Sequence, residues 1–225
     1  MEVKICGLCR PEDATVAAEA GADYVGVVLT PGLRRSQSLE RAEKILGAAA
    51  GAKRVGVFVN STVEELAGAG ARLGLDVLQL HGTEPPELLL ELRGAGPWRL
   101  WKAIRPRSRE EFLAGVDAYG GVADALVVDG WSDKAAGGAG ARFPWEEVAA
   151  ARGAVPAEVR LVVAGGLHPG NVAEAVARLA PDVVDVSSGV ERVVGEKAPE
   201  LVREFVAAAR AAAGEGASDG RPGAG

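Results

Sequence analysis

The feature that most constrains the fold of this chain is a regular alternation of two apolar patterns. Short apolar runs rich in β-branched residues alternate with segments whose apolar residues recur at helical spacing. Nearly continuous apolar runs are typical of parallel strands buried on both faces, so the pattern predicts an α/β protein. The predicted strands are residues 3–6, 24–29, 54–59, 77–81, 100–104, 125–129, 161–164 and 183–186. The predicted helices are residues 12–20, 39–49, 63–73, 87–93, 109–116, 145–152, 171–179 and 199–213.

The number of strand–helix units decides between two α/β architectures. Dividing 225 residues among eight units gives about 28 each, close to the roughly 30-residue scale of a βαβ unit. An open doubly wound sheet would favour Gly-x-Gly-x-x-Gly after the first strand, whereas residues 6–10 read Cys-Gly-Leu-Cys-Arg. We therefore predict a single (β/α)8 TIM barrel over residues 1–213. Residues 214–225, with five glycines and a proline, are expected to form a disordered tail.

Local signals at helix ends agree with this alternation. Ser61 stands three positions before Glu64, the spacing of a capping box at the start of the third helix. Gly74 and Gly94 follow apparent helix ends, where a left-handed glycine commonly terminates a helix.

Charge and composition exclude several classes of partner. The net charge is −6, and no Lys/Arg block extends beyond two residues, which argues against nucleic acid. No apolar run approaches the ~20 residues of a membrane span. The two cysteines are too few for a disulfide framework or a four-cysteine zinc site. The first predicted strand leaves no room for a signal peptide, so we expect a cytoplasmic protein that acts on a small molecule or another protein.

In a (β/α)8 barrel, active sites lie where strands end and the following loops begin. This rule alone selects the candidate residues. They are Lys4, Cys6, Arg34, Arg35, Asn60, Gln79, His81, Lys102, Arg105, Asp129, Gly137, Gly138, Gly140, Gly165, Gly166, Asp185, Ser187, Ser188 and Gly189.

Two of these loops favour a phosphate ligand. Small residues allow backbone N–H groups to point at an anion, and barrels of this kind commonly hold phosphate after strands seven and eight. Gly165-Gly166 and Ser188-Gly189 occupy those two positions. The alternative is a pair of tight turns with no ligand.

Three polar residues at the same end of the barrel have both a structural and a chemical interpretation. Cys6 is either a small buried apolar residue or a reactive thiol at the rim. Asp129 either caps a turn or is a placed acid. His81 either orients a substrate or caps the fourth strand. Cys6 and Cys9 match Cys-x-x-Cys, which is weak evidence for a redox pair in a barrel loop.

An ordered set of motifs carries a family resemblance over residues 3–205. The motifs are Lys4-Ile5-Cys6-Gly7, Arg10-Pro11-Glu12-Asp13-Ala14, Gln79-Leu80-His81-Gly82, Asp129, Gly137-Gly138-Ala139-Gly140 with Phe143, Ala164-Gly165-Gly166-Leu167 with Pro169 and Asn171-Val172, and Asp185-Val186-Ser187-Ser188-Gly189-Val190-Glu191. Together they resemble phosphoribosylanthranilate isomerase of the tryptophan pathway.

The resemblance implies an Amadori rearrangement of N-(5-phosphoribosyl)anthranilate to 1-(2-carboxyphenylamino)-1-deoxyribulose 5-phosphate. No metal or organic cofactor is expected. The family roles carry over to Cys6 as general base and Asp129 as general acid. The acid must be protonated, which requires burial or a neighbouring anion such as the Cys6 thiolate.

The resemblance also implies how the substrate is bound. Arg35, or its neighbour Arg34, faces the anthranilate carboxylate, and Asp185 lies near the ribose hydroxyls. The remaining substrate-binding residues are His81 and, around the phosphate, Gly165, Gly166, Ser188 and Gly189, with Gly138 and Gly140 closing over it.

Two alternatives stay open. A histidine-pathway or dual-substrate phosphoribosyl aminoaldose isomerase is expected to carry aspartate at the end of strand one, where this chain has Cys6. A non-catalytic barrel that binds a phosphorylated metabolite would need the phosphate loops without the Cys6/Asp129 pair. The chain can be a monomer or a homodimer.

Overall fold

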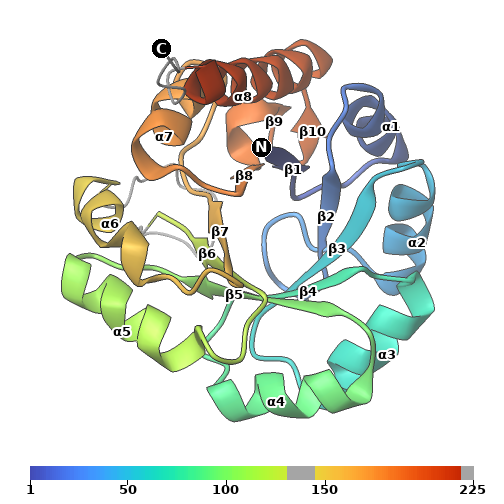
Figure 1. Ribbon diagram of the computed structural model, residues 1–225. Helices are drawn as coiled ribbons and strands as arrows, with labels where there is room; N and C mark the ends of the chain where they lie inside the picture. Colours follow the sequence, from blue (N-terminus) through green and yellow to red (C-terminus); the bar gives the residue numbers. More distant parts are fainter. Residues whose placement is uncertain (131–144, 219–225) are drawn as a thin grey trace.

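The protein is a closed barrel of parallel strands surrounded by helices (Figure 1), described here by a computed structural model that covers residues 1–130 and 145–218. The strands are β1 (Glu2–Ile5), β2 (Tyr24–Val28), β3 (Lys53–Phe58), β4 (Val77–Leu80), β5 (Arg99–Ile104), β6 (Ala125–Val128), β7 (Arg160–Val163) and β8 (Val183–Val186). They are hydrogen-bonded in sequence order, and β1 pairs with β8 to close the ring. The predicted (β/α)8 barrel is confirmed.

One helix follows each barrel strand along the chain. The helices are α1 (Pro11–Glu19), α2 (Leu39–Gly47), α3 (Val63–Leu73), α4 (Pro86–Ala95), α5 (Arg109–Tyr119), α6 (Trp145–Ala151), α7 (Val172–Leu179) and α8 (Pro199–Ser218). Among the described residues, no helix is long and apolar enough to cross a membrane.

Strand alternation divides the core into two layers, because successive side chains point to opposite faces of a strand. On β1, Val3 and Ile5 belong to the larger apolar cluster between sheet and helices. Cys6 belongs to the smaller cluster inside the barrel, where the rings of Tyr24 and Trp101 meet edge to face at 4.9 Å. The nearly continuous apolar strands are therefore explained by burial on both sides.

The segment after β8 differs from the expectation. Two further elements precede the last helix: a 3-10 helix, η2 (Ser188–Val190), and a hairpin of β9 (Glu191–Val193) and β10 (Glu196–Lys197). The hairpin lies beside α8 in Figure 1.

The last helix α8 ends at Ser218 rather than at residue 213. The boundary placed at 213/214 therefore falls inside a helix, and residues 219–225 lie outside the described part of the chain.

Helix caps follow the predicted chemistry with shifts in position. Thr62, not Ser61, caps α3, and it forms a capping box with Glu65. Gly74 ends the same helix with a left-handed φ of 58°. Gly94 lies inside α4, so its predicted role as a terminator is wrong. The observed caps lie one or two residues from the predicted ones, Thr62 instead of Ser61 and Gly96 instead of Gly94. Sequence signals do not place helix ends more precisely than this.

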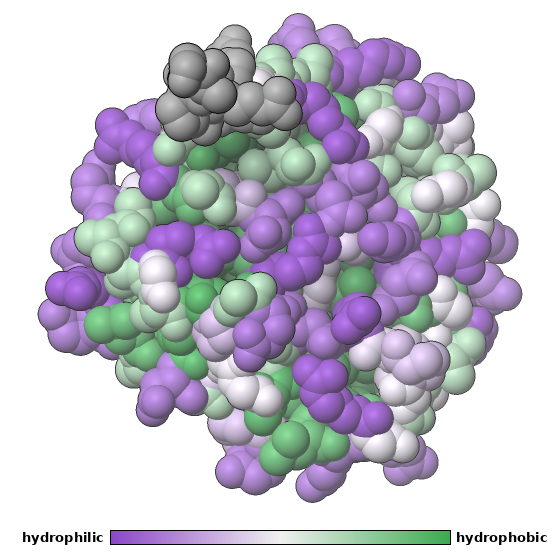
Figure 2. All heavy atoms as spheres, in the orientation of Figure 1, coloured by the Kyte–Doolittle hydropathy of each residue, from purple (hydrophilic) through white to green (hydrophobic). Residues whose placement is uncertain are grey.

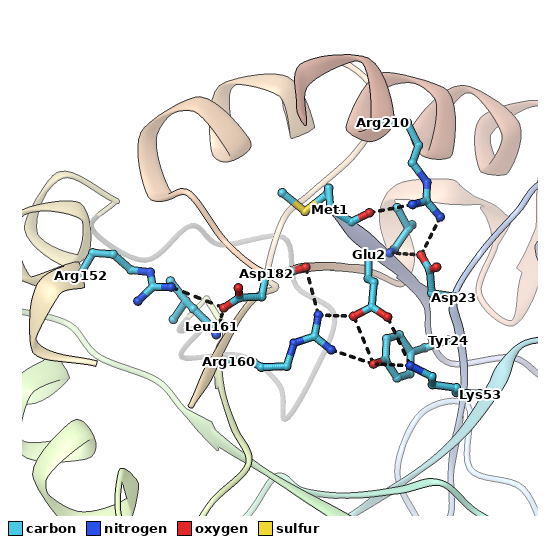
Figure 3. A network of polar contacts seen from close by, with 11 residues as sticks. Met1, Glu2, Asp23, Tyr24, Lys53, Arg152, Arg160, Leu161, Asp182 and Arg210 are labelled. Atoms are coloured by element: carbon cyan, nitrogen blue, oxygen red, sulfur yellow. Dashed lines mark hydrogen bonds and ion pairs between the residues drawn. The ribbon is translucent and has the colours of Figure 1, made fainter. Parts of the chain in front are cut away.

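Four aspartates, each directly before an even-numbered strand, make the same contacts at the amino ends of the strands. Each carboxylate accepts the backbone N–H of a residue on the preceding odd-numbered strand at 2.7 Å. Each aspartate N–H also donates to the carbonyl of that same residue. We call these four residues, Asp23, Asp76, Asp124 and Asp182, the aspartate clamps; Figure 3 shows two of them.

The same end of the barrel carries a further polar network (Figure 3). Glu2 forms ion pairs with Arg160 and Lys53, and the Tyr24 hydroxyl accepts from Arg160 at 2.9 Å. In the space-filling view of Figure 2, hydrophilic side chains gather over the middle of the molecule, and apolar side chains lie mainly toward the lower and left edges. This polar end matches the role of the amino-terminal face of a barrel in stability rather than chemistry.

Replacing a clamp aspartate is expected to destabilise the fold without changing it. Asp76→Ala removes the acceptor of the Arg54 N–H, and loss of one such hydrogen bond costs about 1–2 kcal/mol. Urea unfolding of Asp76→Ala measures this loss. Asp117→Ala, which removes an exposed aspartate on α5, is the control and should stay within about 0.5 kcal/mol of wild type. Equal stability of the two variants would contradict a stabilising role for the clamp.

Candidate active site

The carboxyl ends of β1, β4, β6 and β8 bring predicted site residues to one end of the barrel. Cys6 directly follows β1, His81 follows β4, and Asp129 follows β6, while Asp185 lies within β8. Hydrogen bonds through Lys4 and Gln79 connect Asp185, His81 and Asp129 across the barrel mouth. Cys6 lies beside Lys4.

The Cys6 thiol lies in a buried position beside a cation. Cys6 is 8% exposed, and burial raises the pKa of its thiol, while the Lys4 ammonium acts in the opposite direction. Gly26 on the neighbouring strand makes room for both side chains, because a Cβ there would lie 2.9 Å from Cys6 Sγ and 3.1 Å from Lys4 Cε. A thiolate formed at Cys6 would therefore have the Lys4 cation next to it.

Lys4 is fully buried and connects two other strands of the barrel. Its Nζ donates to Asp185 Oδ2 at 2.7 Å and to Gln79 Oε1 at 2.9 Å. Burial disfavours the ammonium, but Asp185 and Cys6 outweigh this effect and raise the pKa of Lys4. The other carboxylate oxygen, Asp185 Oδ1, is buried and has no hydrogen-bond partner among the described residues.

Asp129 is hydrogen-bonded to His81 and lies close to Arg105. His81 Nε2 and Asp129 Oδ2 are 3.0 Å apart, and Arg105 Nε is 3.7 Å from the same oxygen. Burial favours the neutral acid, but the His81 hydrogen bond and the Arg105 charge outweigh it, so the pKa of Asp129 is lowered. The expectation that the surroundings keep this acid protonated is wrong for this arrangement, because those two donors face it.

Arg35 lies at the rim over Gly7, in a left-handed conformation with φ of 67°. Its Nε donates to Glu191 Oε1 at 2.7 Å, and its Nη2 donates to the other oxygen. The buried Lys197 ammonium is 3.1 Å from Glu191, so two cations share one carboxylate. Arg34, by contrast, is exposed. Burial lowers the pKa of Lys197, although Glu191 favours its ammonium.

The predicted phosphate loops contain glycines that other backbone atoms approach too closely for a side chain. Gly165 and Gly166 have φ values of 80° and 67°, and a Cβ on Gly165 would lie 2.1 Å from the Gly130 nitrogen. Among the described residues, the N–H groups of Gly165 and Gly166 have no backbone acceptor.

Ser188 and Gly189 are the first two residues of η2, and Gly189 packs against the Leu167 carbonyl. Gly138 and Gly140, expected to close over the phosphate, lie outside the described residues.

The sequence predicts Lys102 at the strand end as a site residue, but its side chain contacts groups outside the barrel interior. Its Nζ is 2.8 Å from Glu84 Oε2 and donates to the Gly82 carbonyl at 2.7 Å. Both charged groups are buried, and Trp101 and Ala103, its neighbours on β5, belong to the interior cluster. Lys102 therefore points out of the barrel, because strand alternation places it on the opposite face.

Sequence reasoning missed the residues that hold other site residues in place. Glu191 binds Arg35 from 156 positions along the chain, and no local pattern marks such a pair. Glu84 could have been noticed as an acid three residues after His81. Within the described part of the chain, no three His, Cys, Asp or Glu side chains lie together as a metal site requires.

Comparisons with known proteins give a consistent result. The sequence matches the family model for N-(5'-phosphoribosyl)anthranilate (PRA) isomerase over residues 3–208. A protein of that name from Rubrobacter xylanophilus is 43% identical over 210 residues, which cover 93% of this chain and 98% of that protein. The crystal structure of phosphoribosyl anthranilate isomerase from Thermotoga maritima has 32% identity and a TM-score of 0.84, covering 94% of this chain and 99% of that chain.

A further solved structure of a phosphoribosyl anthranilate isomerase contains a bound ligand. It holds reduced 1-(o-carboxyphenylamino)-1-deoxyribulose 5-phosphate and has 32% identity to this chain and a TM-score of 0.81, covering 94% of this chain and 99% of that chain.

Proposed function

Because this chain belongs to the N-(5'-phosphoribosyl)anthranilate isomerase family, an enzyme family of tryptophan biosynthesis, we propose that it uses Cys6 as general base and Asp129 as general acid. The reaction is the Amadori rearrangement of N-(5'-phosphoribosyl)anthranilate to 1-(2-carboxyphenylamino)-1-deoxyribulose 5-phosphate. The observation that carries the proposal is the thiol and the carboxyl group at one end of the barrel, each beside a cation.

The two groups divide the proton transfers of the rearrangement. Asp129 donates its proton to the ring oxygen as the C1–O bond breaks, and the anthranilate nitrogen lone pair forms a C1=N iminium. The iminium acidifies the C2–H bond, so the Cys6 thiolate can remove that proton, and the bonding electrons form C1=C2 while neutralising the nitrogen. The resulting enol then becomes the ketone by moving a proton from the C2 hydroxyl to C1. General acid–base steps of this kind contribute roughly 10²–10⁴-fold each.

The phosphate end of the substrate has a suitable binding site at the loops after β7 and β8. The N–H groups of Gly165 and Gly166, which have no backbone acceptor in the described part of the chain, and the adjacent residues Ser188 and Gly189 offer backbone donors, which bind anions without requiring a cationic side chain. This local attraction is compatible with a chain whose net charge is −6.

The carboxylate end is assigned to Arg35. Glu191 occupies its Nε and Nη2, which leaves Nη1 of the guanidinium to bind the carboxylate of a ligand. Arg35 is preferred to Arg34 because it lies over Gly7, next to Cys6.

The orphaned Asp185 Oδ1 supports a contact with the ribose. A buried carboxylate oxygen without a partner carries a desolvation cost of about 1–3 kcal/mol, and a ribose hydroxyl in the barrel mouth would supply the missing donor. Lys4 holds the other oxygen of the same carboxylate. Asp185 is therefore proposed to bind the sugar rather than to transfer a proton.

The pH dependence of turnover tests the two roles. The reactive form needs the Cys6 thiolate together with the protonated Asp129, yet the pKa of the thiol is raised and that of the acid is lowered. At every pH between the pKa of Asp129 and the pKa of Cys6, the reactive form is then the same small fraction of the enzyme. Above the pKa of Cys6 it falls because protonated Asp129 becomes scarcer, so the alkaline limb of kcat/KM should lie above the ordinary thiol pKa of about 8.5.

The measurement follows the loss of anthranilate-type fluorescence of freshly prepared N-(5'-phosphoribosyl)anthranilate across the pH range. The alkylation rate of Cys6 in a Cys9→Ser background gives the thiol pKa independently. An alkaline limb at or below the ordinary thiol pKa would contradict the assignment. No turnover of this substrate, with turnover of the histidine-pathway aminoaldose, would overturn the proposed reaction itself.

A further inference from the structure

We infer that Lys4 and Gln79 are positioning residues that fix His81 as the tautomer with its proton on Nε2, so that His81 only donates a hydrogen bond to Asp129. The contacts themselves do not depend on the proposed function. The effect on catalysis rests on the proposed role of Asp129 as the general acid.

The direction of the first hydrogen bond is fixed by Lys4. A lysine ammonium has donors and no acceptor, and Lys4 Nζ lies 2.9 Å from one side-chain head atom of Gln79. That atom must be the amide oxygen, because an NH2 group there would place two donors against each other. Asp185 holds the ammonium from the other side at 2.7 Å, so Lys4 cannot turn away to relieve such a clash.

The amide orientation then fixes His81. With its oxygen on Lys4, Gln79 presents its NH2 group to His81 Nδ1 at 3.0 Å. Nδ1 must accept this bond with its lone pair, and a neutral imidazole then carries its proton on Nε2. His81 Nε2 is 3.0 Å from Asp129 Oδ2, so this N–H donates to the carboxylate. Hydrogen bonding thus runs in one direction from Lys4 on β1 to Asp129 after β6.

Burial prevents the donors and acceptors of these hydrogen bonds from exchanging roles. Gln79 is 1% exposed and Lys4 is 0% exposed, so water cannot replace a partner if the amide turns over. The other charged groups facing these residues act in the same direction: Asp185 and Cys6 favour the ammonium of Lys4, and the Arg105 guanidinium is a cation 3.7 Å from Asp129 Oδ2.

This arrangement matters for an acid that must give its proton to substrate. Imidazole is a stronger base than a carboxylate, so a His81 with a free Nε2 lone pair would take the proton from Asp129. With Nε2 already protonated and Nδ1 engaged by Gln79, His81 has no lone pair to offer. The proton of Asp129 is then available only to the substrate or to solvent.

The test is the protonation pattern of His81, read by ¹⁵N NMR, in which protonated and unprotonated ring nitrogens differ widely in chemical shift. The chain has two histidines, and a His168→Asn variant assigns the signals. We expect wild-type His81 at neutral pH to be protonated on Nε2 and unprotonated on Nδ1. A proton on Nδ1, alone or together with Nε2, would overturn the inference, and this result needs no variant at position 79 to fold.

Gln79→Glu tests the direction of these hydrogen bonds, because glutamate has nearly the same shape as glutamine. Glutamate accepts from both neighbours, so His81 should become protonated on Nδ1. Gln37→Glu makes the same change at a partly buried glutamine that contacts Arg41 and the Arg35 carbonyl, and it should leave the His81 signals unmoved. Unchanged His81 signals in folded Gln79→Glu would count against the inference.

The activity measurement separates this inference from the proposed function. If Asp129 is the acid, Gln79→Glu should lower kcat at least about tenfold, the effect of roughly one pKa unit, with little change in KM. The expected NMR change with unchanged kcat would keep the tautomer assignment and contradict the role of Asp129. Unchanged NMR with lost kcat would contradict the positioning role of Gln79.

Discussion

The Cys6→Ser and Asp129→Asn variants are each expected to lose at least about 10²-fold in kcat, as measured by fluorescence loss of N-(5'-phosphoribosyl)anthranilate. Serine keeps the shape of the cysteine, but its hydroxyl is too weak an acid to be ionised by Lys4, so the base is lost. Asparagine keeps an acceptor oxygen for His81 and has no acidic proton. Both losses should appear in kcat rather than in KM, because neither group is assigned to hold the substrate.

Cys9→Ser is the matched control for the first variant, since it makes the same atomic change three residues away. The Cys9 thiol is 3.6 Å from the Gly7 carbonyl and is assigned no part in the reaction, so kcat should stay close to wild type. Circular dichroism and thermal unfolding confirm that each variant is folded. Nearly full activity of Cys6→Ser would mean that another group removes the C2 proton.

Replacing Glu84 by alanine is expected to cause the largest loss of stability, about 3–5 kcal/mol, because it leaves the buried Lys102 ammonium without its counter-ion. The substitution also removes the acceptor of the Asn60 and Gly82 N–H groups. Burial opposes ionisation of Glu84, but Lys102 outweighs it and lowers the pKa of the acid. The pair's contribution is therefore present at neutral pH and is lost as the pH falls through the lowered pKa of Glu84.

Guanidinium unfolding at neutral and acidic pH measures the stability lost in Glu84→Ala. Two further variants serve as comparisons. Glu40→Ala breaks the exposed Arg72–Glu40 pair and should cost much less than Glu84→Ala, because exposed ion pairs contribute little to stability. The double variant Glu84→Leu/Lys102→Met removes both charges and should recover part of the stability. A loss in Glu84→Ala no greater than in Glu40→Ala would show that the buried pair does not stabilise the segment after His81.

The parts of this fold that could be predicted from the sequence are those encoded locally. Strand burial on two faces produces continuous apolar runs, and the rule for barrel active sites then places Cys6 and Asp129 at one end. The structure agrees with both positions. The type and position of a residue do not show which side chain from another strand will contact it.

Two residues illustrate this limit. The pKa of Asp129 depends on His81 from β4 and Arg105 from the end of β5, so its direction could not be obtained from the residue and its burial. Lys102 differs from the interior residues Trp101 and Ala103 only by the parity of its position on β5. Because successive side chains of a strand point to opposite faces, proximity to the strand end does not decide whether a side chain lies inside the barrel.

The aspartate clamps make the junctions between neighbouring strands differ in their hydrogen bonds. At β1–β2, β3–β4, β5–β6 and β7–β8 a carboxylate adds to the backbone bonds. At the four alternate junctions the same aspartates contribute only their carbonyl groups, for example Lys53 N–H to Asp23 O. The ring is thus built from four pairs of strands, and within each pair a carboxylate bond is added to the backbone bonds. Duplication or recombination of this barrel would preserve every carboxylate bond only if it joined whole pairs.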